Sequence, residues 1–115
     1  MKHKILLLSA NYYKDISREL CVDAYKTLKD HGNTEYDEMA VIPGVFEIPV
    51  LISRNIEKYD GFVALGCVIK GETPHFDFIS RATTDAIMNL SITHKKPIGN
   101  GILTCLNYDQ AKLRA

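Results

Sequence analysis

The sequence predicts an α/β domain built on a four-stranded parallel sheet whose two faces are covered by helices. Four short apolar segments alternate with four segments of helical character, and no repeat, linker or low-complexity stretch interrupts them. Parallel strands need crossover connections, and helical crossovers lie on the faces of the sheet. The 115 residues, 46% of them hydrophobic, suffice for a single domain over residues 1–115 with a modest core.

The first two strand–helix units are predicted from hydrophobic periodicity and turn signals. Residues 4–9 are expected to form a strand, and residues 15–31 a helix that stops at a His-Gly pair. The apolar stripe of this helix consists of Ile16, Leu20, Ala24 and Leu28. A second strand is expected over residues 36–42 and a second helix over residues 46–59. The inward-facing residues of the second helix are Ile48, Leu51, Ile52 and Ile56.

The last two units follow the same pattern. Residues 62–69 and 98–104 are expected to be strands, and residues 74–94 a long helix. A fourth helix opens near Tyr108 but has too few residues to be stable alone, so we expect that the sequence lacks the end of its C-terminal helix. Ligands of parallel sheets bind beyond the carboxyl ends of the strands. The candidate loops are therefore residues 10–15, 43–47, 67–75 and 104–109.

Composition excludes several classes of function. Lys+Arg and Asp+Glu each count 14, so no overall field attracts nucleic acid or a membrane surface. The cysteines Cys21, Cys67 and Cys105 lack metal-ligand spacing, so we expect no metal site and the reduced thiols of a cytoplasmic protein. The apolar run near the N-terminus is too short for a signal peptide or a membrane span. Neither dinucleotide nor nucleoside-triphosphate glycine motifs occur.

The segment after the third strand combines an anion site with a proton donor. In Gly71-Glu72-Thr73-Pro74-His75, Thr73 can cap the next helix and Pro74 suits its first position. The free amides and the helix dipole favour a phosphate or carboxylate there, and the same dipole favours a neutral imidazole that exchanges protons. The segment indicates chemistry on a small phosphorylated molecule, and the alternative is a capping or solvent-facing histidine.

Residues of the other loops have both a functional and a structural interpretation. Tyr12 can stack on a planar ring or cover the end of the sheet. Glu47 can accept hydrogen bonds from a polar ligand or complete the dipole of the helix that follows. Cys67 is a small lining residue, because no cation or histidine close in sequence would activate it. Arg114 can bind a phosphate bidentately or be an ordinary surface residue.

Three segments together resemble the lumazine synthase family, in order along essentially the whole chain. They are residues 43–49 (PGVFEIP), 64–76 (ALGCVIKGETPHF) and 97–104 (PIGNGILT). The resemblance implies a flavodoxin-like three-layer α/β/α fold and a cofactor-free reaction of riboflavin biosynthesis. In it, 5-amino-6-(ribitylamino)pyrimidine-2,4-dione condenses with 3,4-dihydroxy-2-butanone 4-phosphate to give 6,7-dimethyl-8-ribityllumazine, phosphate and water.

The resemblance also implies the roles of individual residues. His75 matches the family's proton donor, Glu72 and Thr73 its phosphate loop, and Arg114 its phosphate-binding arginine. Tyr12 falls where an aromatic ring stacks on the pyrimidine. The segments that line the pyrimidine and ribityl site correspond to Val45, Phe46, Glu47, Cys67, Val68 and Ile69. Asn100 stands where many members have an aromatic residue that packs on the ring, which implies weaker stacking.

The family's site lies between neighbouring subunits, with the fourth-strand loop and the arginine crossing over. The resemblance thus implies a homopentamer, in some members assembled into a hollow icosahedral shell of about 60 subunits. A second hypothesis is a non-catalytic flavin- or lumazine-binding or shell-forming protein on the same fold, favoured by Tyr12 and Asn100. His75 and Arg114 favour the enzyme, because a pure binding protein needs no proton donor.

Overall fold

The computed structural model describes residues 2–115 and contains one parallel sheet in the order β2-β1-β3-β4. The strands are β1 (His3–Ala10), β2 (Thr34–Ile42), β3 (Gly61–Ile69) and β4 (Ile98–Cys105). The helices are α1 (Lys14–Asp30), α2 (Ile48–Asn55), α3 (His75–His94) and α4 (Tyr108–Arg114), and a short 3₁₀ turn, Val45–Glu47, precedes α2. The predicted fold is confirmed: all three strand pairings are parallel, and helices alternate with strands along the chain.

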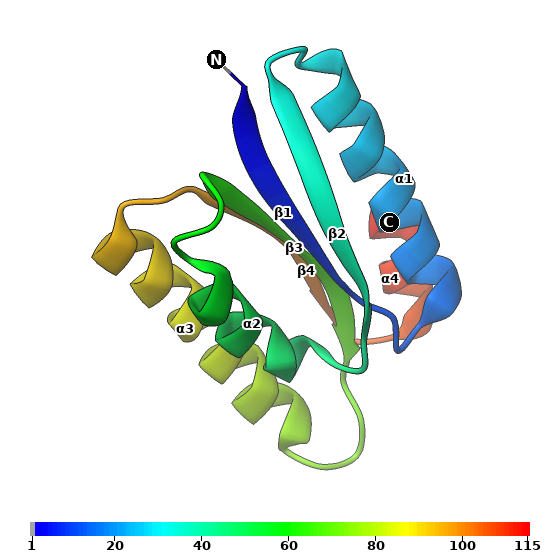
Figure 1. Cartoon of the computed structure of the whole chain (residues 1–115). Helices are drawn as coiled ribbons and strands as arrows, with labels where there is room; N and C mark the ends of the chain where they lie inside the picture. Colours follow the sequence, from blue (N-terminus) through cyan, green and yellow to red (C-terminus); the bar gives the residue numbers. More distant parts are fainter. Residues whose placement is uncertain (1) are drawn as a thin grey trace.

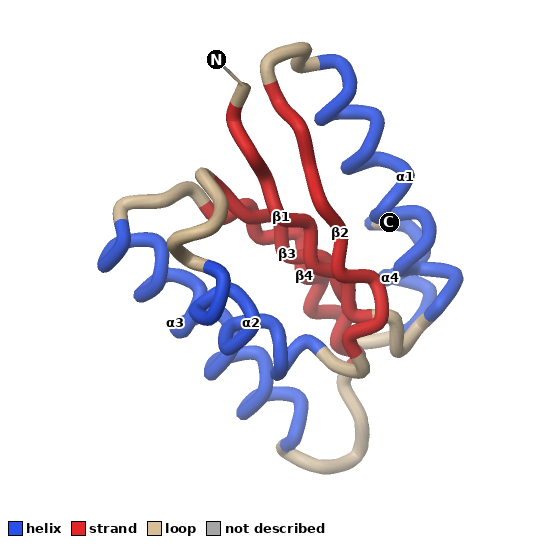
Figure 2. The backbone as a smooth tube through the Cα atoms, in the orientation of Figure 1, coloured by secondary structure: helices blue, strands red, loops and turns tan. Residues whose placement is uncertain are grey.

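The helices form one layer on each face of the sheet (Figure 1). Helices α2 and α3 lie on one face, and α1 and α4 on the other, so the strands occupy the middle of the molecule (Figure 2). Each face has its own apolar core. The larger core, under α2 and α3, includes Leu6, Leu8, Ile48, Ile52, Phe62 and Ile87. The smaller core, under α1 and α4, consists of Ile16, Cys67, Cys105 and Ala111.

The order of the strands sets the position of a ligand site. Strands β1 and β3 are neighbours in the centre of the sheet, but the chain leaves β1 toward one edge strand, β2, and leaves β3 toward the other, β4. The loops that follow β1 and β3 therefore diverge at the carboxyl edge, and a crevice opens between them. Among residues 2–115, no helix is long and apolar enough to cross a membrane.

Most predicted boundaries are within two residues of the observed ones, and the second helix is the largest departure. It was expected to run to residue 59 but ends at Asn55. The carbonyls of Ile56 and Tyr59 instead accept hydrogen bonds from the Lys96 ammonium, which lies before β4. The chain ends α2 in tighter turns, in which the amides of Ile56 and Lys58 donate to the carbonyls three residues before them. Ile56 still packs into the larger core, as its place on the apolar stripe predicted.

Candidate active site

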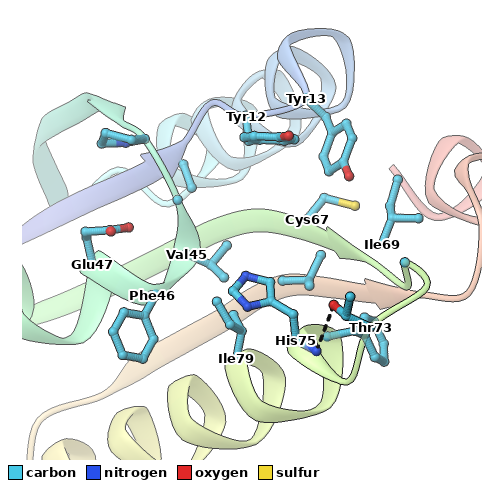
Figure 3. Close-up of a pocket in the computed structure, with 16 residues that line it drawn as sticks. Tyr12, Tyr13, Val45, Phe46, Glu47, Cys67, Ile69, Thr73, His75 and Ile79 are labelled. Atoms are coloured by element: carbon cyan, nitrogen blue, oxygen red, sulfur yellow. Dashed lines mark hydrogen bonds between the residues drawn. The ribbon is translucent and has the colours of Figure 1, made fainter.

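A cavity of about 590 Å³ lies at the carboxyl edge of the sheet, where three of the four predicted loops meet. Its walls come from the ends of β1 and β3, the turn before α2, and the first turn of α3 (Figure 3). The lining residues are Ala10, Tyr12, Tyr13, Pro43, Gly44, Val45, Phe46, Glu47, Cys67, Val68, Ile69, Gly71, Thr73, His75, Phe76 and Ile79. Apolar and aromatic side chains predominate, as in sites for small organic molecules.

An aromatic wall closes one side of the cavity. Tyr12 and Tyr13 pack edge to face, with ring centroids 4.9 Å apart and planes at 76°. Tyr12 is 74% exposed, so a face of its ring is free to stack on a planar ligand. Figure 3 shows both rings on the side of the cavity opposite His75. The loop that carries them is short, because β1 ends at Ala10 and α1 begins at Lys14.

Val45 and Cys67 belong to the apolar surface at the base of the cavity. Val45, buried at the start of the 3₁₀ turn, lies against the backbone of Gly66 in β3. Cys67 is buried, and burial together with the neighbouring thiol of Cys105 raises its pKa to about 11. The protonated thiol is a poor nucleophile, so this residue shapes the cavity, as the sequence predicted.

His75 is the first residue of α3 and points from the helix into the cavity (Figure 3). The hydroxyl of Thr73 accepts a 3.4 Å hydrogen bond from the His75 amide. The N-cap residue of α3 is Pro74, so the expected arrangement, with Thr73 as the cap and Pro74 as the first helical residue, is wrong by one position. The imidazole is exposed at the cavity mouth and can reach both a bound ligand and water. In the first turn, the amides of Asp77 and Phe78 donate to the Pro74 carbonyl, so the Phe76 amide is the one left without a hydrogen-bond partner within residues 2–115 and available to an anion.

Phe46 and Glu47 form the end of the cavity away from Thr73 (Figure 3). The 3₁₀ turn holds both side chains at the rim, where Phe46 is 58% exposed. A Cβ on Gly44 would lie only 3.0 Å from a Glu47 carboxylate oxygen, so the glycine leaves room for this carboxylate. An exposed carboxylate at this position can accept hydrogen bonds from hydroxyl or amide groups of a ligand.

Three of the candidate residues do not line this cavity: Glu72, Asn100 and Arg114. Glu72 lies in the exposed loop before α3. Asn100 lies within β4, and its side-chain oxygen accepts a 3.0 Å hydrogen bond from the Ile102 amide. Arg114 ends α4, and its guanidinium contacts β4 of the same chain, 3.4 Å from the Thr104 carbonyl and 3.8 Å from the Cys105 sulfur. Within one chain, the predicted phosphate-binding arginine and the histidine are not brought together.

The structure adds lining residues that the candidate set lacked, notably Tyr13, Phe76 and Ile79. Ile79 follows His75 by four residues, a spacing that puts both side chains on one face of a helix. The sequence contained that signal. Tyr13 stands beside Tyr12 after the first strand, where an aromatic residue can stack on a planar ring or cover the end of the sheet. The sequence does not give the direction of its ring, which depends on how α1 packs on the sheet.

No group of three or more histidine, cysteine or acidic side chains in residues 2–115 is arranged to hold a metal ion. The polar groups of the cavity include an imidazole, a carboxylate, the hydroxyls of Thr73 and the two tyrosines, and the Phe76 amide, beside the aromatic faces. This set suits proton transfer on an anionic ligand that contains a planar ring.

The chain was compared with known protein families and proteins. The family model for 6,7-dimethyl-8-ribityllumazine synthase matches residues 2–115. A 6,7-dimethyl-8-ribityllumazine synthase of Agrobacterium fabrum is 42% identical over 120 residues, covering 98% of this chain and 80% of the relative. That of Bartonella bacilliformis is 43% identical over 96% of this chain and 74% of the relative. That of Corynebacterium kroppenstedtii is 39% identical over 97% and 69%.

Proposed function

The chain belongs to the 6,7-dimethyl-8-ribityllumazine synthase family, transferases of riboflavin biosynthesis, and we propose that His75 is its acid–base residue. The family's reaction condenses 5-amino-6-(ribitylamino)pyrimidine-2,4-dione with 3,4-dihydroxy-2-butanone 4-phosphate. The observation that carries the proposal is the position of His75, on the first turn of α3 at the mouth of a cavity whose opposite wall is aromatic.

His75 would serve each proton-dependent step of the condensation. The amine of the pyrimidinedione attacks the ketone, and water leaves as the imine forms. Loss of the proton at C3 and of phosphate from C4 then gives an enol, which takes up a proton at C4 and becomes a new ketone at C3. The ribitylamino nitrogen adds to this ketone, and a second water leaves as the ring closes. Each step adds or removes a proton at nitrogen, carbon or oxygen, and an imidazole performs both transfers near neutral pH. The exposed ring also exchanges protons with solvent between steps.

The two ends of the cavity would bind the two substrates. The Phe76 amide at the start of α3, with the Thr73 hydroxyl and the backbone amides of Glu72 and Thr73 in the loop before it, would hold the phosphate of the butanone. The pyrimidinedione would stack on Tyr12 and lie against Val45, Cys67, Val68 and Ile69, a mainly apolar surface. Phe46 and Glu47 would border the ribityl chain, whose hydroxyls can donate to the carboxylate.

We propose that the site is completed by a neighbouring copy of the chain in a homopentamer, and that pentamers can associate further into an icosahedral shell. Asn100 and Arg114 do not line the cavity of their own chain. In the assembly, they would line the cavity of a neighbouring subunit. Apolar side chains exposed on α3 and near α4 support association. They are Phe78, Met88, Ile92, Leu106 and Leu113.

A second feature of the α2–α3 face supports the same assembly. A cleft of about 430 Å³ between these helices has the buried Thr83 in its lining. The Thr83 hydroxyl has no hydrogen-bond partner within residues 2–115. Buried hydroxyls are almost always paired, so a polar group of a neighbouring subunit is the partner we expect. We also place the protein in the cytoplasm, where its free cysteines would stay reduced.

The test is to mix the purified protein with both substrates and follow the absorbance and fluorescence of the lumazine. We expect a rate well above the spontaneous reaction. In His75→Ala, kcat should fall about 100-fold or more, while the dissociation constant of the lumazine changes little. Lumazine binding without turnover by the unmodified protein would instead establish the non-catalytic binding protein. Unchanged turnover in His75→Ala would remove the histidine from the mechanism.

A further inference from the structure

Tyr13 lines the cavity, and both its backbone and its ring are fixed. Its carbonyl accepts a 2.9 Å hydrogen bond from the Ser17 amide, in the first turn of α1. The Ser17 hydroxyl is in turn held 2.8 Å from the hydroxyl of Ser9, and both serines are buried. The aromatic ring packs against the smaller core, beside Cys67. The direction of the phenol is thus set before any ligand arrives.

The phenol hydroxyl of Tyr13 is a hydrogen-bond donor that the protein leaves unused. Burial, followed by the neighbours Tyr12 and Cys67, raises its pKa above the ordinary value of 10.0, and no hydrogen bond within residues 2–115 contributes to this shift. The group therefore stays protonated across the range in which enzymes work. Figure 3 shows the oxygen directed toward the Cys67 sulfur, at the wall of the cavity. The protonated thiol is a weak donor, so the Tyr13 hydroxyl is the stronger of the two donors at this wall.

The angle between the two tyrosine rings determines which part of a ligand Tyr13 can meet. A planar ring stacked on Tyr12 lies parallel to it, and Tyr13 stands at 76° to that plane. Tyr13 then faces the edge of the stacked ring. Carbonyl oxygens accept hydrogen bonds near the plane of the carbonyl group, which coincides with the ring plane in a pyrimidinedione.

We propose that Tyr13 contacts the substrate directly and donates a hydrogen bond to a ring carbonyl of the pyrimidinedione. This inference rests on the proposed function, because that function supplies the ring. It makes Tyr13 a specificity residue: Tyr12 recognises the face of the ring, which any planar molecule offers, and Tyr13 recognises the carbonyl at its edge. The hydroxyl takes no part in proton transfer, so the proposal concerns binding of one of the two substrates.

The test is Tyr13→Phe, which keeps the ring and removes only the hydroxyl. The KM for the pyrimidinedione and the dissociation constant of the lumazine should each rise about five- to tenfold, the effect of one hydrogen bond. The KM for the butanone phosphate should stay the same, and kcat should change less than about twofold. This split between the substrates is a result that a general loss of structure would not give.

Tyr36→Phe is the matched control, because Tyr36 lies on β2 and outside the cavity lining, and its ring stacks on Tyr25. It should change neither KM. An unchanged KM for the pyrimidinedione in Tyr13→Phe would overturn the proposal. Equal losses for both substrates, accompanied by a lower melting temperature, would also overturn it and leave Tyr13 a structural role. The proposed function fails separately, by absence of lumazine formation in the unmodified protein.

Discussion

The Cγ1 methyl of Val45 lies 2.5 Å from the place that a Cβ on Gly66 would occupy. The turn before α2 therefore sits directly on the backbone of β3, and no other residue fits at position 66 without displacing this cavity wall. We expect Gly66→Ala to destabilise the fold by about 1–3 kcal/mol, the usual cost of overpacking. Because Val45 must move, the KM for the pyrimidinedione should also rise. Urea denaturation and initial rates measure the two effects.

Gly32→Ala is the control for this substitution. Gly32 follows α1, and nothing lies within 4 Å of the Cβ that the change would add. Its free energy of unfolding should stay within about 0.5 kcal/mol of the unmodified protein. If Gly66→Ala were as stable as Gly32→Ala, the close contact between the turn and β3 would be absent in solution.

The sequence predicted the sheet because its information is local. Segments such as residues 62–69 are apolar throughout, and the helical stripe of Ile16, Leu20, Ala24 and Leu28 needs no tertiary context to be recognised. The boundary of α2 could not be read in this way. Beyond its end the chain makes a distant contact that local patterns do not contain: the Lys96 ammonium donates to the carbonyls of Ile56 and Tyr59, 40 and 37 residues earlier in the sequence.

The candidate site also contains residues whose positions follow from local sequence and residues whose positions depend on tertiary packing. Residues within a short motif, such as Thr73 and His75, lie together in the cavity because they are two residues apart and the His75 amide donates to the Thr73 hydroxyl. Their relation to Arg114 depends on how α4 packs, and in the structure the arginine, at the end of α4, contacts the Thr104 carbonyl of β4. Tyr13 depends on how α1 packs on the sheet. Tertiary packing, which single-sequence patterns do not encode, decided both cases.

The buried hydroxyl pair of Ser9 and Ser17 should behave as a coupled unit. The two oxygens lie 2.8 Å apart, and the Cys21 thiol donates to Ser9 at 3.3 Å. Ser17→Ala should cost about 1–3 kcal/mol, because it leaves a buried hydroxyl without its partner. In Ser9→Ala/Ser17→Ala the loss should be smaller than the sum of the two single losses. Chemical denaturation of the four proteins in this cycle measures the coupling.

An exposed serine provides the comparison for this cycle. Ser53→Ala in α2 should shift the free energy of unfolding by less than about 0.5 kcal/mol. Strictly additive losses at Ser9 and Ser17 would show that the two hydroxyls are not bonded to each other in solution.

The Cys67 thiol should resist alkylation in the folded protein. Burial and the adjacent Cys105 raise its pKa to about 11 from an ordinary value of 9.0. At pH 8, iodoacetamide should label Cys67 far more slowly in the native protein than in urea, as measured by mass spectrometry of its peptide. The folded state binds this proton more tightly, so the associated stability is fully present below pH 9 and is lost as the pH rises toward 11. Equal labelling in the two states would contradict this environment.

The separation of Arg114 from the cavity of its own chain leads to a test of subunit mixing. If each site takes His75 from one subunit and Arg114 from the next, His75→Ala and Arg114→Ala are complementary defects. Each variant alone should have low activity. After the two are unfolded together and refolded, a site has an intact histidine in half of the cases and an intact neighbouring arginine in half. About a quarter of the sites should then regain full activity.

The alternative gives the opposite result. If both residues acted within one chain, every site of the mixture would still contain one defect, and no activity would return. Mixing the folded variants without unfolding them is the control, because activity should then recover only as fast as the subunits exchange. Recovery after refolding, and its absence in this control at short times, would require a site built from two chains. That result would fit the contact of the Arg114 guanidinium with Thr104 and Cys105 of its own chain, outside the cavity that holds His75.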